Sequence, residues 1–149
     1  MEIDIASARK MIASAEDWAS SLGISATIVV LDAGGDLVAM ERMDGAWPGG
    51  FDLAHGKAQT SRSFRAPSAA FVPLIQPGQP LYSVNSMHSG RYVIIGGGLP
   101  IQLGADCVGS VGVSGGTPEQ DVEIAEAALS AFSPTGSGKQ NGRSDRIRY

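Results

Sequence analysis

The sequence predicts an α+β domain in which helices pack on an antiparallel sheet of about five strands. Its hydrophobic periodicity gives, in order, one helix, two strands, two helical stretches, three strands and a last helix. Short turns join neighbouring strands, and such turns require antiparallel pairing because parallel strands need long crossovers. The length of 149 residues and the 43% hydrophobic content fit one domain of ordinary size.

The first helix is predicted between Ile5 and Leu22, where apolar residues recur every three or four positions. Asp4 is its expected N-cap, and Gly23 follows its end. The β-branched run 26–32 then predicts a buried strand. A turn at 33–36 joins it to a second strand, 37–43, so the two form a hairpin.

The middle of the chain begins with a loop at 44–50, which is rich in residues that break regular structure. A helix is predicted from about Phe51 to Phe64, since Pro67 follows closely. A shorter helical piece is predicted over 68–74, and the prolines and glycine of 76–80 end it.

Three strands and one helix complete the prediction. The strands are Arg91 to Ile95, Leu99 to Leu103 and Cys107 to Val113, with a turn at 104–106 joining the last two. Thr117, Pro118 and Gln120 form the start of a capping box, so the last helix is predicted from there to near Phe132.

Charge divides the chain into two parts. Residues 1–132 carry a net charge of −7, whereas residues 133–149 carry +3 from Lys139, Arg143, Arg146 and Arg148 against Asp145. We therefore predict a domain over 1–132 and a flexible basic tail over 133–149. The tail is either an electrostatic arm onto an acidic neighbouring subunit or partner, or a solvated extension. The acidic body argues against nucleic-acid binding.

Composition excludes several classes of protein. No apolar run approaches the length of a membrane-spanning helix, and the single cysteine cannot form a disulfide within the chain. The start lacks the pattern of a secretory signal, so we expect a cytoplasmic protein. Charged residues are only 17% and glycines number 20. Both values fit a turn-rich domain, or one that hides part of its surface in a homo-oligomer.

Two charged residues lie on helix faces that are otherwise apolar. Lys57 falls among Leu53, Thr60 and Phe64 on the 51–64 helix, and Asp121 flanks the apolar stripe of the last helix. A buried lysine needs a carboxylate partner, a cavity or a path to water. Two readings stay open: a salt bridge that organises the core, or a ligand-facing pair that anchors an anion or transfers a proton.

The two histidines do not predict a dedicated metal site, but one of them could bind haem iron. His55 and Arg62 share the helix face opposite Lys57, which is either solvent-exposed or a subunit interface. His55 and His88 lie far apart in sequence and Cys107 has no partner motif, so a dedicated metal site is not expected. A histidine, Met40 or Met43 could still be an axial haem ligand, and nothing in the sequence selects among them.

Two glycine-rich stretches follow strands. Gly96 to Gly98 and Ser114 to Gly116 match neither a Walker-type loop nor a dinucleotide-binding loop. The second lies just before a helix N-terminus, where backbone N–H groups could hold a carboxylate or phosphate. The alternative for these glycines is close backbone packing or a bulge.

Ordered motifs over about residues 1–132 give the chain a family resemblance. They are Arg42-Met43-Asp44-Gly45-Ala46, Lys57-Ala58 with Phe64, Gln76-Pro77-Gly78, Gly96 to Ile101, and Val108 to Gly116 with Gln120-Asp121. With them the chain resembles the GlcG/HbpS family, which includes the C-terminal domain of PduO-type proteins. It departs from the family pattern at His55-Gly56, where a glycine inside a helix costs roughly 1 kcal/mol against alanine.

The resemblance implies a profilin-like fold with a five-stranded antiparallel sheet. It also implies homo-oligomers built from dimers, from tetramer to octamer, and haem as a cofactor of some members. The shared polar positions of the family carry over to Asp44, Lys57 and Asp121, with the backbone of 98–100 and of Ser114-Gly115.

Two functional hypotheses result, and whether the chain is an enzyme stays open. The first is a small-molecule-binding protein of a catabolic pathway, with a pocket between sheet and helices for an anionic metabolite or haem. Its predicted ligand-binding residues are Met43, Asp44, Lys57, Arg62, Gly98, Pro100, Ser114 and Gly115. The second is a cofactor-independent isomerase, tautomerase or lyase for a carboxylate-bearing metabolite. Its predicted catalytic residues are Lys57, Asp121 and His55.

Overall fold

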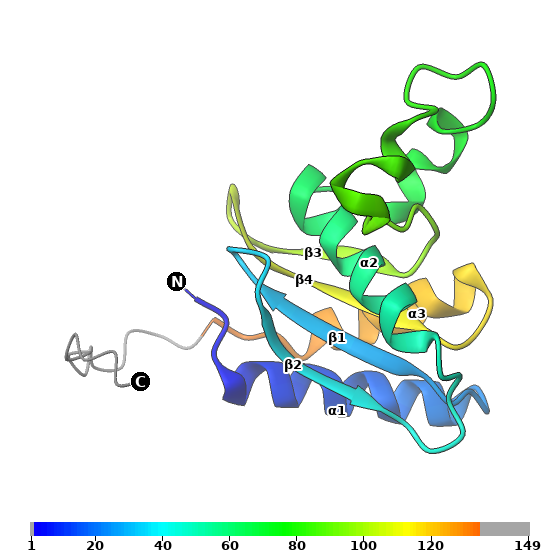
Figure 1. Ribbon diagram of the computed structural model, residues 1–149. Helices are drawn as coiled ribbons and strands as arrows, with labels where there is room; N and C mark the ends of the chain where they lie inside the picture. The colour runs from blue at the N-terminus through cyan, green and yellow to red at the C-terminus, as the bar shows by residue number, and fades with distance from the viewer. Residues whose placement is uncertain (1, 135–149) are drawn as a thin grey trace, which may run out of the picture.

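In the computed structural model, which describes residues 2–134, the middle layer is a four-stranded antiparallel sheet (Figure 1). Its strands lie in the order β2-β1-β4-β3. Their bounds are Thr27–Asp32 for β1, Leu37–Arg42 for β2, Gly98–Leu103 for β3 and Asp106–Ser114 for β4. The predicted hairpins β1–β2 and β3–β4 are both present, so the antiparallel α+β class is confirmed.

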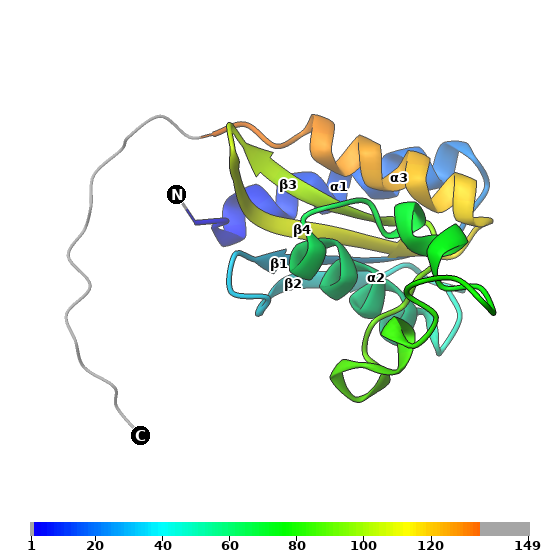
Figure 2. The ribbon, with the colours of Figure 1, turned by 90° about the horizontal axis from the view of Figure 1, so that it is seen from above.

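Three α-helices cover the two faces of the sheet. Helices α1 (Ile5–Ser21) and α3 (Pro118–Ser130) lie side by side on one face, and α2 (Gly50–Phe64) covers the other (Figure 2). Alternate residues of β1 serve the two layers, since Ile28 and Val30 pack with α1 and α3 whereas Val29 and Leu31 pack with α2. Both faces of the central strands are therefore buried.

The predicted helix caps are confirmed. The side chain of Asp4 accepts a hydrogen bond of 2.7 Å from the N–H of Ser7 at the start of α1. At the start of α3, Thr117 accepts from the N–H of Gln120, and the Gln120 side chain accepts from the N–H of Thr117. This reciprocal capping box fixes where α3 begins beside the sheet.

The predicted strand from Arg91 to Ile95 is wrong, which is why the sheet has four strands rather than five. This segment runs along α2 instead of along another strand. The N–H of Val93 donates to Oγ1 of Thr60 at 3.1 Å, and the carbonyl of Ile95 accepts from the hydroxyl of Ser68 at 2.6 Å. Its polar backbone groups thus find partners outside the sheet.

The segment between α2 and β3 contains three short 3-10 helices. They are η1 (Ser68–Leu74), η2 (Val84–Ser86) and η3 (His88–Gly90). The first of them is the predicted short helical piece. Figure 1 shows this segment projecting beyond the sheet on the side of α2.

Helix α2 packs on the sheet through glycines. A Cβ atom added at Gly112 of β4 would collide with the carbonyl of Ala54, and one added at Gly98 of β3 would collide with the carbonyl of Lys57. The hydroxyl of Ser110 also donates to the carbonyl of Ala58 at 2.8 Å. The backbone of α2 therefore lies directly against β3 and β4, which sets the position of Lys57.

Two further expectations concern the chain as a whole. Among the residues that the structure describes, no helix is long and apolar enough to cross a membrane. The predicted basic tail over 133–149 lies almost wholly outside the described residues, which end at Pro134.

Candidate functional site

Lys57 and Asp121 form a buried ion pair that joins the two helical layers. Nζ of Lys57 lies 2.8 Å from Oδ2 of Asp121, and both side chains are 3% exposed. Nζ also donates to the carbonyl of Val113 at 2.9 Å. Of the environments expected for a lysine on an apolar face, the structure gives this one a carboxylate partner.

The second carboxylate oxygen of Asp121 is also engaged. Oδ1 accepts a hydrogen bond of 2.8 Å from the N–H of Gly116, in the turn before α3. The backbone N–H groups predicted to hold an anion therefore hold a carboxylate of the same chain. Burial raises the pKa of Asp121, while the Lys57 ammonium and the N–H groups of Gly116 and Gly115 oppose this shift.

Glycine is required beside this pair. Gly97 has a φ of +128°, and a Cβ atom there would lie 2.9 Å from Cβ of Asp121 and 3.1 Å from Cδ of Lys57. The structure thus brings together Lys57, Asp121, Gly98 and Gly115 from the predicted set. Ser114, which is 2% exposed, ends β4 just before them.

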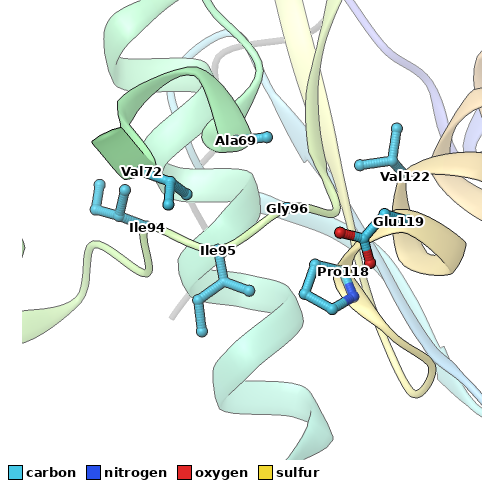
Figure 3. Close-up of a pocket in the computed structure, with 8 residues that line it drawn as sticks. All are labelled: Ala69, Val72, Ile94, Ile95, Gly96, Pro118, Glu119 and Val122. Atoms are coloured by element: carbon cyan, nitrogen blue, oxygen red, sulfur yellow. The ribbon is translucent and has the colours of Figure 1, made fainter. Parts of the chain in front are cut away.

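An apolar pocket of about 390 Å³ lies beside Gly96, one residue from the glycine that contacts the ion pair. Figure 3 shows its wall of side chains from η1, from the segment before β3 and from the start of α3. The lining residues are Ala69, Val72, Ile94, Ile95, Gly96, Pro118, Glu119 and Val122. None of them is a histidine, methionine, cysteine or tyrosine, so this pocket offers no usual axial ligand for haem iron.

A second pocket, of about 250 Å³, contains the predicted residue His55. Its lining residues are Asp52, Leu53, His55, Gly56, Gly90, Arg91 and Val93. The imidazole of His55 stacks on the ring of Phe51, with ring centroids 5.3 Å apart. The face of α2 opposite Lys57 is thus partly covered by the 90–93 segment.

The environment of His55 favours a neutral imidazole. Burial lowers the pKa of His55, and the nearby Arg91 lowers it further, whereas Asp52 raises it. Nε2 of His55 lies 3.4 Å from Nε2 of Gln59. An amide nitrogen can only donate, so this contact fits a lone pair on Nε2. A neutral imidazole is the form that binds metal ions.

Four other predicted residues have contacts of their own that do not involve the ion pair. Sδ of Met43 accepts from the N–H of Ala26 at 3.3 Å, and Asp44 is exposed in the next loop. Nε of Arg62 donates to the carbonyl of Ala33 at 2.7 Å. Pro100 lines a pocket of about 340 Å³ near the end of α3. None of the pockets described in this article combines Met43, Asp44, Lys57, Pro100 and Asp121 in one lining.

Sequence reasoning missed Arg91 and Asp52, which line the His55 pocket. Asp52 lies three positions before His55 on the same helix, a spacing that places both side chains on one face. That spacing could have been noticed. The place of Arg91 could not, because it depends on the 91–95 segment running along α2. Among the described residues, no group of three or more metal-ligating His, Cys, Asp or Glu side chains occurs.

Comparison with known proteins gives one family. Residues 3–130 match the family model described as haem degrading protein HbpS-like. An uncharacterised 15.0 kDa protein encoded between dhaT and dhaS in Citrobacter freundii is 40% identical over 131 residues, which are 88% of this chain and 92% of that protein.

Two solved structures are similar over nearly the whole chain. The protein ORFY of Klebsiella pneumoniae is 35% identical, with a TM-score of 0.86 over 88% of this chain and 91% of that one. A complex of PduOC with heme is 28% identical, with a TM-score of 0.85 over 89% of this chain and 96% of that one.

Proposed function

Because the chain belongs to the HbpS-like family, we propose that it binds haem at the pocket formed by His55 and Arg91. The heme complex of the similar PduOC chain supports haem as the ligand class. The observation that carries the assignment is that His55 and Arg91 line the same pocket. No other pocket described above contains a histidine.

The two side chains match the two polar parts of haem. A neutral imidazole is a common axial ligand of haem iron, and Nε2 of His55 would bind iron in place of its contact with Gln59. The guanidinium of Arg91, which is exposed beside it, suits a propionate carboxylate because it can form paired charged hydrogen bonds. The residues present therefore fit the group, which when bound would supply an iron centre for ligand coordination or electron transfer.

The size of the pocket limits how haem could be enclosed. Its volume of about 250 Å³ lies below the range of about 300–1,000 Å³ typical of pockets that enclose small ligands. The protein would therefore cover only part of the porphyrin. Open binding of this kind fits a protein that takes up and releases haem rather than one that holds it permanently.

Haem titration tests the proposal. We expect a Soret absorption shift with the wild-type protein, and a rise of more than about tenfold in Kd for His55→Ala, which is about 1.4 kcal/mol. The matched control is His88→Ala, since His88 is exposed and stacks on Tyr92 outside the pocket lining. A wild-type protein without a Soret shift contradicts haem binding. Loss with His88→Ala but not with His55→Ala contradicts the site.

The role of Arg91 has its own measurement. Arg91→Gln should weaken binding of haem but leave the binding of haem dimethyl ester unchanged, because the ester has no propionate charge. An equal loss for both ligands would show that Arg91 acts on the pocket shape and not on a carboxylate.

A second candidate function rests on the raised pKa of the buried Asp121 next to Lys57. Buried, charge-paired groups with shifted pKa values are common in active sites. This candidate is an isomerase, tautomerase or lyase for a carboxylate-bearing metabolite, in which Lys57 anchors or polarises the substrate and Asp121 transfers a proton. The adjacent apolar pocket beside Gly96 would admit the substrate.

Substitution of Lys57 separates this candidate from a purely structural pair. If the pair is catalytic, Lys57→Met abolishes turnover of the metabolite while the fold survives. If the pair only organises the core, Lys57→Met lowers the free energy of unfolding by about 3–5 kcal/mol, because it leaves a buried carboxylate without its partner. Circular dichroism and chemical denaturation measure whether the variant stays folded and how stable it is. An assay of turnover then shows whether a folded variant has lost activity.

A further inference from the structure

A groove of about 480 Å³, larger than the three pockets described above, is lined by residues of α1 and α3. These two helices lie on the face of the sheet away from α2, the helix that carries His55 (Figure 2). The hydroxyl of Ser14 donates to the carbonyl of Ala127 at 2.8 Å and joins the two helices there. The residues that line the groove are Ser14, Asp17, Trp18, Ser21, Glu123, Glu126, Ala127 and Ser130.

The groove combines negative charge with an exposed aromatic ring. Asp17, Glu123 and Glu126 are all exposed, and no lysine or arginine lines the groove. Within residues 2–134 these three carboxylates have no ion-pair partner. Trp18 is 46% exposed, an unusual state for so large an aromatic side chain. The groove therefore suits a cationic segment that can also cover an aromatic face.

The same chain carries a segment of that chemistry. Residues 139–149 contain Lys139, Arg143, Arg146 and Arg148 against Asp145, whereas residues 1–132 have a net charge of −7. Arginine can bond a carboxylate through two parallel N–H groups and can stack on a tryptophan face. The charges of the groove and of this segment are thus complementary.

The attachment point of the segment allows it to reach the groove. Helix α3 ends at Ser130, which lines the groove, and the described residues end at Pro134. Nine positions separate Pro134 from Arg143, and a chain advances at most about 3.3–3.6 Å per residue, so Arg143 can lie roughly 30 Å away. Helix α3 has 13 residues and is about 20 Å long.

We propose that the basic segment 139–149 docks in the groove between α1 and α3 of its own chain. Arginine side chains bind Asp17, Glu123 and Glu126 and cover Trp18. Attachment to the end of α3 keeps the segment at a high effective concentration near the groove. This contact is independent of the haem site, which lies on the other face of the sheet.

Fluorescence quenching of Trp18 by the neutral quencher acrylamide tests the proposal in the full chain. Trp47→Phe removes the second tryptophan and serves as the background. In this background, replacement of Lys139, Arg143, Arg146 and Arg148 by Gln should raise the quenching constant of Trp18. At about 1 M salt, where the Debye length is about 3 Å, the two chains should be quenched equally.

A change in the groove should have the same effect as a change in the segment. The triple variant Asp17→Asn, Glu123→Gln and Glu126→Gln should expose Trp18. If the four Gln substitutions of the basic segment are made in the same chain, the quenching constant should not rise further. The matched control is Glu2→Gln with Asp36→Asn and Asp106→Asn, which removes three exposed carboxylates outside the groove. This control should leave Trp18 protected.

Three results would overturn the proposal. Equal quenching of the wild-type and neutral segments at low salt would mean that the segment does not cover Trp18. Protection that survives high salt would mean that charge does not hold it there. Protection that grows with protein concentration would assign the groove to the segment of a second copy instead.

Discussion

Two carboxyl groups, Glu16 of α1 and Glu41 of β2, share a hydrogen bond where the helix lies against the edge of the sheet. Two carboxylates can share such a bond only if one of them keeps a proton. This bond, partial burial and the charges of Glu41 and Asp17 raise the pKa of Glu16 from 4.5 to about 7. The protein thus holds a proton there at mildly acidic pH.

The free energy of unfolding should depend on pH because of the proton on Glu16. Between pH 4.5 and about 7 the folded protein binds a proton that the unfolded chain has released. The free energy of unfolding therefore falls as pH rises through this range, and the stabilisation is complete only below its lower end. Glu16→Gln should remove the slope, so that the variant has the higher Tm above neutral pH. Thermal unfolding of both proteins at acidic and alkaline pH checks this.

A surface control shows whether the slope belongs to the Glu16–Glu41 pair. Glu2→Gln removes an exposed carboxylate of the same type elsewhere and should keep the wild-type slope. If Glu16→Gln also keeps that slope, another group must cause it.

At the scale of elements, Gly56 shows how α2 and the 91–95 segment depend on each other. A Cβ atom at Gly56 would collide with Cγ2 of Val93 and lie 2.8 Å from the carbonyl of Arg91. Glycine inside a helix is unfavourable, but here it lets the segment lie against the helix. Gly56 lowers the stability of the helix, but it allows Arg91 to lie beside His55 and so to form the pocket.

Gly56→Ala should destabilise the protein although alanine favours helices. Overpacking at such a site costs about 1–3 kcal/mol, which exceeds the gain of roughly 1 kcal/mol in helix propensity. Chemical denaturation measures the difference. A second change, Val93→Ala, should restore part of the stability because it removes the colliding methyl groups.

The control for this substitution is Gly49→Ala. Gly49 precedes α2, and a Cβ atom there has no neighbour within 4 Å. Its substitution should change stability only slightly. A stabilised Gly56→Ala protein would show that Val93 can move aside.

The elements that the sequence predicts correctly are those with local causes. Asp4 and Thr117 cap helices through bonds within one turn, and the turns of the two hairpins act over a few residues. The strand predicted at 91–95 is wrong because β-branched residues indicate an extended chain but do not show whether a neighbouring strand pairs with it. Its hydrogen bonds go to Thr60 and Ser68, which no local pattern reveals.

The same division holds for the candidate site. Helix periodicity placed Lys57 and Asp121 on inward faces, because burial on one side of a helix is a local property. It could not show that the partner of each is the other, since 64 positions separate them. Family resemblance groups Met43, Asp44 and Pro100. In the structure Met43 and the adjacent Asp44 lie beside Ala26, whereas Pro100 lines a pocket near the end of α3.

At the scale of the whole molecule, the segment 66–90 contains no Asp, Glu, Lys or Arg. It nevertheless exposes several large apolar side chains, among them Val72, Leu74, Tyr82 and Met87. An uncharged, exposed apolar surface is typical of a contact between protein chains. The predicted homo-oligomer stays a prediction, and this segment is the surface on which we expect it to form.

Sedimentation velocity tests this assembly. We expect the wild-type protein to sediment as an oligomer, and Tyr82→Glu to shift it toward the monomer because a charge would then be buried in the contact. Trp47→Glu is the matched control, since Trp47 is 56% exposed and lies outside the segment. A monomeric wild-type protein, or equal dissociation by both variants, would contradict the assignment.

The pairing of β1 with β4 determines when the sheet can form during synthesis on the ribosome. Thr27 pairs with Ser114, 87 positions later in the chain. A ribosome adds about 5–20 residues per second, so roughly 4–17 s pass between the synthesis of Thr27 and that of Ser114. During this time the edge of β1 opposite β2 has no partner strand, so its backbone N–H and C=O groups are unpaired. The nascent chain is therefore open to wrong pairing until nearly all of its last strand has left the ribosome.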